Sequence, residues 1–326
     1  MVQTAFEKLL TKIGVSQAQR SQGSTSHQHI RGLLDNKWKN DSSFPWLTDG
    51  DFLSGSYARE TKIHPLDDID VMVVIDGTGL SVIEKGIYID AEVRGGGKIG
   101  SPVSTYTYGS GGLISSKIIL EAFRDAIKES YPNSEIRKNG QAVNVWFESY
   151  GMGIDIVPCF HILPRDNRKE FYYIPQGGES HEWITTNPKI DADICDGIDD
   201  RHDNKLKPVI RILKHWNKVQ NDSRLESYHL ETVALYMFDG HPEQIRNYSS
   251  AIQYFFNNAE DHFQNSCPDM TGLGGPVDEY LTPTARQSTI EKIRQAREVI
   301  NSHHFMGMTT QEKQITGWRK IFGDTF

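Results

Sequence analysis

The segment Gly55–Ile75, GSYARETKIHPLDDIDVMVVI, combines a Gly-Ser pair, two carboxylates and an apolar run. The run IDVMVVI at 69–75 is β-branched and apolar apart from one acid, which is typical of a buried strand. Side chains alternate along a strand, so Asp68 and Asp70 share one face. Two carboxylates held this close repel each other unless a cation neutralises them, so the stretch predicts a divalent-metal site.

A third acid is expected to complete this site. Asp155 in GIDIVP (153–158) lies between two isoleucines on another predicted apolar strand, where a charge is costly unless it faces a cation or water. We expect this strand to pair beside the first, so that Asp155 joins Asp68 and Asp70 as a ligand. Hard oxygen ligands of this kind suit two Mg²⁺ ions, with Mn²⁺ as a substitute, bridging a nucleoside triphosphate.

The Gly-Ser pair before the strand suits a phosphate. Gly55 permits close backbone approach, and Ser56 offers a hydroxyl and an N–H at the start of a short helix expected within 50–62. A lone Asp-x-Asp pair is also typical of an acidic strand end at the surface. The combination with Gly-Ser and a third acid is what indicates a nucleotidyltransferase site.

Composition limits the class of protein. The chain has 326 residues, enough for one large domain or two lobes, and a net charge of −8, which argues against constitutive DNA binding. Its three cysteines are far apart and lack zinc-site spacing, so we expect free thiols in a reducing compartment. Because we find no signal-peptide core and no membrane-spanning apolar stretch, we expect a cytoplasmic protein without a membrane partner.

The pattern along the first half predicts both helices and strands. Apolar residues recur at helical spacing in 3–20, 25–40 and 114–132, whereas 142–147 and 151–160 have strand character. The Gly/Ser-rich segment 93–112 predicts a mobile surface loop. It contains GGGK, but Lys98 is followed by isoleucine, which excludes a Walker A phosphate loop.

The pattern changes after residue 164. Segments 206–219, 227–238 and 289–300 are helical in pattern, and Ser288-x-x-Glu291 predicts the start of the last helix. We therefore expect a catalytic core with N-terminal helices at 1–164 and a helical lobe at 165–326. The first half alone indicates an α/β or α+β fold.

These motifs resemble a known superfamily. Gly55-Ser56, Asp68-Ile69-Asp70 and Asp155 resemble the signature of DNA polymerase β-like nucleotidyltransferases. The stretches that select a family are LKHW (213–216), SYHLE (227–231) and GWRKIFGDTF (317–326). They resemble the bacterial cGAS/DncV-like nucleotidyltransferases (CD-NTases), which are SMODS-type second-messenger synthases, over nearly the whole chain from about residue 20. The resemblance implies an α+β fold: a polymerase β-like core with a mixed sheet, and an oligoadenylate synthetase-like helical lobe, with the active site in the cleft.

The resemblance also implies a reaction. A ribose hydroxyl of one nucleotide attacks the α-phosphate of another, pyrophosphate leaves, and a second transfer closes a cyclic di- or trinucleotide. The substrates are NTPs, with ATP expected among them, and the enzyme is expected to be a monomer. The product would act as a second messenger in antiphage (CBASS) defence and activate a separate effector. Direct DNA activation is not implied, because the zinc insertion of the animal cyclic GMP-AMP synthase is missing from this sequence.

The resemblance assigns further roles. Gly55, Ser56, Lys214 and Ser227 are implied to bind the donor triphosphate, and Tyr228 to stack on the donor base. Stacking on an aromatic ring holds any base, so it does not select ATP over GTP. A half-buried residue at a helix start is the alternative for Tyr228.

Other polar residues of these segments are given structural roles or none. Lys207 lies on the same helical stripe as the predicted triphosphate lysine, and we expect it on a solvated face. Gln141 and Asn144 point to opposite faces of their strand, so either could line the acceptor pocket and neither is assigned. His229 and Glu231 are expected to be structural.

Three rival functions remain open from the sequence. They are a linear oligonucleotide synthase or RNA-tailing enzyme, a small-molecule nucleotidylyltransferase and a non-enzymatic nucleotide-binding regulator. The sequence does not determine the bases, the ring size or the 2′–5′ or 3′–5′ linkage of a product. It is equally silent on any activator or regulatory protein and on the role of the loop at 94–112.

Overall fold

The computed structural model describes residues 1–85, 90–96, 100–148, 151–163, 170–304 and 310–326. The chain divides into two compact units. The sheet unit comprises Gln17–Ala58 and Pro65–Lys189, and the helical unit comprises Met1–Ser16, Arg59–His64 and Ile190–Phe326.

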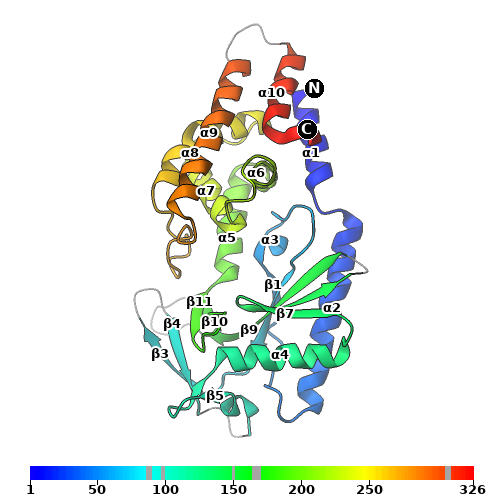
Figure 1. Cartoon of the computed structure of the whole chain (residues 1–326), viewed down its shortest axis with the longest axis vertical. Coiled ribbons are helices and arrows are strands. Elements are labelled where there is room, and N and C mark those ends of the chain that lie inside the picture. The colour runs from blue at the N-terminus through cyan, green and yellow to red at the C-terminus, as the bar shows by residue number, and fades with distance from the viewer. Residues whose placement is uncertain (86–89, 97–99, 149–150, 164–169, 305–309) are drawn as a thin grey trace. The chain divides into compact units, whose positions relative to one another are not determined.

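One mixed sheet organises the sheet unit (Figure 1). Its strands are β1 (Phe52–Ser54), β2 (Asp70–Ile75), β3 (Ser81–Lys85), β4 (Asp90–Arg94), β5 (Thr107–Tyr108), β6 (Leu113–Ile114), β7 (Glu135–Asn139), β8 (Ala142–Phe147), β9 (Met152–Ile162), β10 (Phe171–Pro175) and β11 (Trp183–Thr186). The order runs β1-β2-β9-β10-β11-β4-β6-β5, with β3 beside β4 and the β7–β8 hairpin beside β9. β9 is central, because it pairs in parallel with β2 and antiparallel with β8 and β10.

One helix packs over part of this sheet, and a second packs against that helix. The helical elements here are α2 (Gln17–Asn40), α3 (Gly55–Ala58), α4 (Ser116–Ser130) and the 3₁₀ helix η1 (Pro102–Thr105). The Ser115 hydroxyl accepts a hydrogen bond from the Ile118 N–H and so caps α4. The apolar stripe of α4 packs over β7 to β10, and α2 packs against α4 (Figure 1).

The helical unit is built around α6 and α7. Its helices are α1 (Val2–Ile13), α5 (Pro188–Arg201, whose first two residues belong to the sheet unit), α6 (Leu206–Gln220), α7 (Ser227–Asp239), α8 (Tyr248–Gln264), α9 (Pro283–His304), α10 (Gln311–Phe322) and the 3₁₀ helix η2 (Gly323–Thr325). Aromatic packing joins the two ends of the chain, because the Phe6 ring meets the rings of Trp318, Phe322 and Phe326. The Lys12 ammonium also donates to the Thr325 carbonyl at 2.8 Å.

The α+β fold with a mixed sheet and a helical C-terminal part is confirmed, and so is a short helix within 50–62. The last boundary between the compact units falls after Lys189 and not at the expected residue 165, since β10 and β11 continue the sheet. The segment Arg59–His64 also belongs to the helical unit although it precedes β2.

Three local predictions need correction. The first helix ends at Ile13, because the next residue, Gly14, has an extended backbone, and the second N-terminal helix begins at Gln17. The described part of the Gly/Ser-rich segment is not one loop but contains the end of β4, η1 and β5. Helix α9 begins at Pro283, five residues before the predicted cap, because Thr282 accepts a hydrogen bond from the Ala285 N–H and proline suits a first helical turn.

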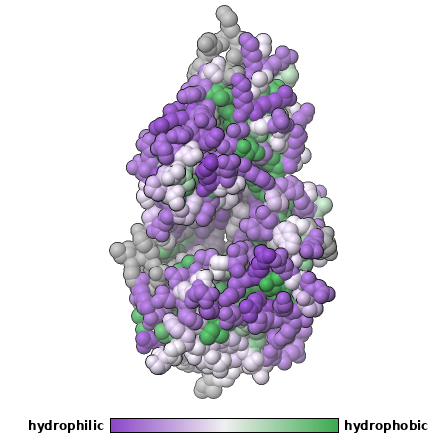
Figure 2. Space-filling model, in the orientation of Figure 1, coloured by the Kyte–Doolittle hydropathy of each residue, from purple (hydrophilic) through white to green (hydrophobic). Residues whose placement is uncertain are grey.

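The surface carries few apolar residues. On the face shown in Figure 2, hydrophilic residues cover most of the described surface and apolar residues form small separate spots. Among the helices of the described residues, none is both long and apolar enough to cross a membrane.

Candidate active site

Two of the three predicted carboxylates lie side by side in the sheet. β2 and β9 pair in parallel with Asp70 opposite Asp155, which confirms the predicted pairing of these strands. The ladder extends one residue before β2, because the Ile69 N–H donates to the Gly153 carbonyl at 3.1 Å and the Asp155 N–H donates to the Ile69 carbonyl at 2.9 Å. Directly paired residues project from the same face of a sheet, so both carboxylates lie on one side.

Asn144 continues this row on the next strand. It lies opposite Asp155 in the antiparallel pair of β8 and β9, and its amide nitrogen Nδ2 donates to Asp155 Oδ1 at 2.7 Å. The sequence left Asn144 unassigned because alternation alone does not reveal which strand lies next to it. The structure therefore aligns Asp70, Asp155 and Asn144 across three neighbouring strands.

Gly55 lies directly against this row. Its φ is +67°, and a Cβ placed on it would fall 1.8 Å from Asp70 Oδ2. Both the left-handed backbone and the close carboxylate require glycine here. Ser56 follows as a half-buried residue of α3. The structure thus brings the Gly-Ser turn and the Asp70 carboxylate together, as the sequence predicts.

Asp68 lies half-buried immediately before β2, two residues from Asp70. In the part of the chain that the structure describes, no three His, Cys, Asp or Glu side chains are gathered into a formed metal centre. The assignment of Asp68 therefore rests on strand alternation. The chemistry of the donor set fits Mg²⁺, because the paired Asp70 and Asp155 offer only hard carboxylate oxygens.

An apolar floor surrounds the carboxylates. The residues that share the sheet face of Asp70 and Asp155 on β2 and β9 belong to an apolar cluster, comprising Met72, Val74, Val157 and Cys159 together with Ala142 and Tyr172. Asp155 is only 9 % exposed. Repulsion between like charges is stronger beside apolar groups than in water, so the pair creates a demand for cations.

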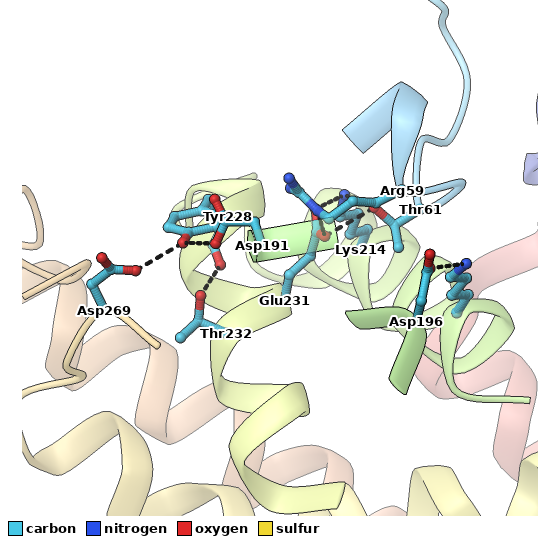
Figure 3. Close-up of polar contacts among 10 residues, drawn as sticks. Arg59, Thr61, Asp191, Asp196, Lys214, Tyr228, Glu231, Thr232 and Asp269 are labelled. Carbon is cyan, nitrogen blue, oxygen red and sulfur yellow. Dashed lines mark hydrogen bonds and ion pairs between the residues drawn. The ribbon is translucent and has the colours of Figure 1, made fainter. Parts of the chain in front are cut away.

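A buried cluster of charges lies in the helical unit (Figure 3). Lys214 on α6 forms an ion pair with Glu231 on α7. The second oxygen of Glu231 accepts from Arg59 Nε at 3.1 Å and from the Thr61 hydroxyl at 2.9 Å. Arg59, Lys214 and Glu231 are each at most 7 % exposed. Lys214 is predicted to contact a triphosphate. In the structure it already has a partner within the protein, Glu231.

Burial and charge act against each other in this cluster. Burial alone would raise the pKa of the Glu231 carboxyl, but Lys214 and Arg59 outweigh it and lower this pKa to about 2. Burial lowers the pKa of the Lys214 ammonium, and the neighbouring Arg59 cation adds to the effect. Glu231 is thus shared by two buried cations, and the Asp191 carboxylate is a second negative group that acts on Arg59.

Tyr228 lies in a cage of polar groups at the start of α7 (Figure 3). Its hydroxyl is 2.7 Å from Asp191 Oδ1 and 3.0 Å from Asp269 Oδ1. The Arg59 guanidinium carbon lies 5.6 Å from the ring centroid. Burial and the Asp191 carboxylate raise the pKa of the Tyr228 hydroxyl, so this group stays protonated. Ser227, the first residue of α7, is exposed.

The predicted residues thus fall into two groups. Asp68, Asp70, Asp155, Gly55 and Ser56 belong to the sheet unit, whereas the predicted triphosphate and base contacts at positions 214, 227 and 228 belong to the helical unit. Sequence analysis missed Arg59 and the partnership of Glu231. The sequence held one signal for Glu231. It lies four residues after Ser227, one helical turn away, in the SYHLE motif that also contains the predicted contact Tyr228.

Comparison with known proteins identifies the family and supports the fold. A model of the Second Messenger Oligonucleotide or Dinucleotide Synthetase domain (SMODS) matches residues 1–92 and 101–196, more than half of the chain. A probable cyclic nucleotide synthase of Bacillus cereus is 27 % identical over 92 % of this chain and 90 % of its own. A cyclic AMP-AMP-AMP synthase of Escherichia coli is 22 % identical over 84 % of this chain and 82 % of its own.

Solved structures share the fold at low identity. Escherichia coli MS115-1 CdnC with ATP superposes with a TM-score of 0.71 at 17 % identity, covering 99 % of this chain and 98 % of that one. The same protein in a CdnC:HORMA-deltaN complex gives a TM-score of 0.70, with the same identity and coverage. Together with the family match, this likeness confirms the resemblance to the CD-NTases.

Proposed function

Because the chain belongs to the SMODS family of second-messenger synthetases, we propose that it joins NTPs into a cyclic di- or trinucleotide and releases pyrophosphate. The product is a second messenger of bacterial antiphage (CBASS) signalling and activates a separate effector. ATP is one of the substrates. The named activity of the Escherichia coli relative, cyclic AMP-AMP-AMP synthesis, supports this choice of nucleotide.

The observation that carries the proposal is the parallel register of Asp70 and Asp155 on one sheet face, with Gly55 against the Asp70 carboxylate. We assign Asp68, Asp70 and Asp155 to hold two Mg²⁺ ions, which Mn²⁺ can replace. When bound, the ions supply positive charge to the attacking hydroxyl and to the departing phosphates. The carboxylates themselves fix where the reacting groups lie, and such positioning is the main source of catalysis in phosphoryl transfer.

The donor nucleotide has a second set of contacts. We assign its triphosphate to Gly55, Ser56, Lys214 and Ser227, and its base to stacking on Tyr228. The gathering of two buried cations, Lys214 and Arg59, around Glu231 supports a role in binding an anion. The ribose hydroxyl oxygen of the acceptor bonds to the α-phosphorus of the donor, and the bond from this phosphorus to pyrophosphate breaks.

The setting of the enzyme follows from these assignments. We expect a cytoplasmic monomer, for which the three free, buried cysteines are suitable. A regulatory protein is a further expectation, supported by the complex of CdnC with HORMA-deltaN. Synthesis of linear oligonucleotides is the alternative outcome of the test below.

The test is a product assay. The pure protein is incubated with all four NTPs and Mg²⁺, treated with phosphatase, and the products are identified by mass spectrometry. A nuclease specific for 3′–5′ linkages reports the connectivity in a parallel sample. Phosphatase-resistant cyclic species that are lost in the Asp68→Ala/Asp70→Ala variant support the proposal. Linear ladders, or products that persist in this variant, contradict it.

A further inference from the structure

Asn144 occupies an unusual place for its residue type. It lies in the middle of β8, where its chain neighbours Val143 and Val145 are fully buried on the opposite face. Asparagine is disfavoured within strands, because its amide does not pack as β-branched and aromatic side chains do. A half-buried amide in this position therefore needs a specific polar partner.

That partner is Asp155. Nδ2 of Asn144 donates to Asp155 Oδ1 at 2.7 Å, a short distance that suits a donor to an ionised carboxylate. Gly153 lies two residues before Asp155 on the same face. A Cβ placed on it would lie 2.1 Å from the Asp67 carbonyl oxygen and 3.1 Å from Asn144 Nδ2, so glycine is required beside this contact.

The contact restrains one carboxylate of the site. The main chain of Asp155 is fixed by its N–H bond to the Ile69 carbonyl, but the side chain can still rotate about its own bonds. A hydrogen bond to Oδ1 from the adjacent strand fixes that rotation. Since an amide carries no charge, Asn144 does this without adding to the charge of the paired Asp70 and Asp155.

We infer that Asn144 is a positioning residue, which holds the Asp155 carboxylate in the orientation that binds metal beside Asp70. The inference rests on the proposed function, because it takes Asp155 as a metal ligand. Groups that orient a metal ligand by hydrogen bonding typically contribute 10- to 100-fold to metal affinity or activity.

The test measures metal binding directly. Asn144→Leu removes the amide donor with little change in volume, and Gln141→Leu makes the same chemical change on the exposed turn of this hairpin. Mn²⁺ binding to the full-length protein is titrated by electron paramagnetic resonance. The titration is run with Mn²⁺ alone and with an ATP analogue whose methylene bridge between the α- and β-phosphates prevents reaction.

We expect Asn144→Leu to weaken Mn²⁺ binding about 10-fold and to lower kcat by about 10- to 100-fold. KM for NTPs should change by less than about threefold, because the donor triphosphate keeps its other contacts. Asn144→Gln, which keeps an amide donor on a longer stem, should recover part of the Mn²⁺ affinity. Gln141→Leu should match the wild type. Mn²⁺ affinity within about twofold of wild type in folded Asn144→Leu overturns the inference.

A parallel Asp155→Asn variant separates the two proposals. If Asp155→Asn loses Mn²⁺ binding and product while Asn144→Leu keeps both, the inference about Asn144 is wrong and the proposed function stands. If Asp155→Asn keeps both, Asp155 is not a metal ligand, and the site assignment within the proposed function is wrong although the activity stands. Should Asn144→Leu fail to fold, the comparison of Asn144→Gln with wild type decides, since a purely structural amide would leave Mn²⁺ affinity unchanged in this folded variant.

Discussion

Two groups of residues compensate charge in opposite ways. One is the row of Asp70, Asp155 and Asn144 in the sheet unit, and the other is the charged cluster around Glu231 in the helical unit. In the sheet unit, Asp70 and Asp155 bring like charges into register over an apolar floor, with a neutral amide beside them. In the helical unit, Glu231 lies between two cations, Lys214 and Arg59, and forms an ion pair with each. The row depends on cations from outside, whereas the cluster is nearly complete without a ligand.

This difference predicts which substitutions should lower activity and which should lower stability. Removing a charge from the row relieves repulsion in the free protein and removes a ligand for metal. Removing the anion from the cluster leaves buried cations without a partner, which is strongly destabilising. The four predictions below test this contrast, beginning with the largest expected effect.

Asp70→Asn should abolish activity and leave the fold intact. Losing about 4 kcal/mol of charge stabilisation in the transition state corresponds to about a 10³-fold lower rate of pyrophosphate release. The melting temperature should be unchanged or higher, because one of two paired like charges is gone. Pyrophosphate release and thermal unfolding check both halves. An Asp70→Asn variant that keeps its activity, or that is as unstable as the Glu231→Gln variant, would contradict this contrast.

Glu231→Gln should destabilise the protein by about 3–5 kcal/mol, because the buried Lys214 and Arg59 lose their compensating charge. Urea denaturation monitored by circular dichroism measures this change. The matched control is Asp196→Asn, which makes the same acid-to-amide change in the more exposed pair with Lys207. This control should cost less than about 1 kcal/mol. Equal losses in the two variants would refute the special position of Glu231.

The free energy of unfolding should depend on pH through His229, in a pH range higher than the range in which Glu231 titrates. Burial lowers the pKa of its imidazole from 6.5 to about 4. Between these values the unfolded chain binds a proton that the folded protein does not, so the free energy of unfolding falls as pH decreases from 6.5 to 4. The full effect is on the order of 3 kcal/mol.

The measurement is urea denaturation at several pH values, with His229→Gln for comparison. The difference in stability between wild type and variant should change between pH 6.5 and 4 and stay constant above pH 7. Glu231, with its pKa lowered to about 2, adds its own loss only below about pH 4.5, the ordinary value for a glutamate. A wild-type curve parallel to that of the variant throughout would show that His229 is not buried in its neutral form.

Gly55→Ala should reduce activity by about 10- to 100-fold, because its Cβ would displace the Asp70 carboxylate, and a misplacement of about 1 Å costs about 10²-fold. Gly178→Ala is the matched control. Gly178 also has a positive φ, of +60°, but a Cβ there would meet no atom within 4 Å. Pyrophosphate release compares the two variants. Similar losses of activity in both would attribute the effect to backbone strain rather than to the site.

The sequence determined the features that depend on neighbours along the chain. Alternation predicted that Asp68 and Asp70 share one face, apolar flanks marked Asp155 as a charge that needs a partner, and helical spacing identified α4, α6 and α7. The Gly-Ser turn was predictable for the same reason. Each of these patterns repeats over two to four residues, which is the range over which backbone geometry sets side-chain direction.

Only the tertiary structure decided which residues meet across the fold. The register that sets Asp155 between Asp70 and Asn144 depends on how three strands align, and a slip of one residue would turn the side chains of a strand to its other face. The attachment of Arg59 to Glu231 joins residues 172 positions apart. No local period encodes such contacts, because they arise from the packing of whole elements and from the cost of leaving a buried charge without a partner.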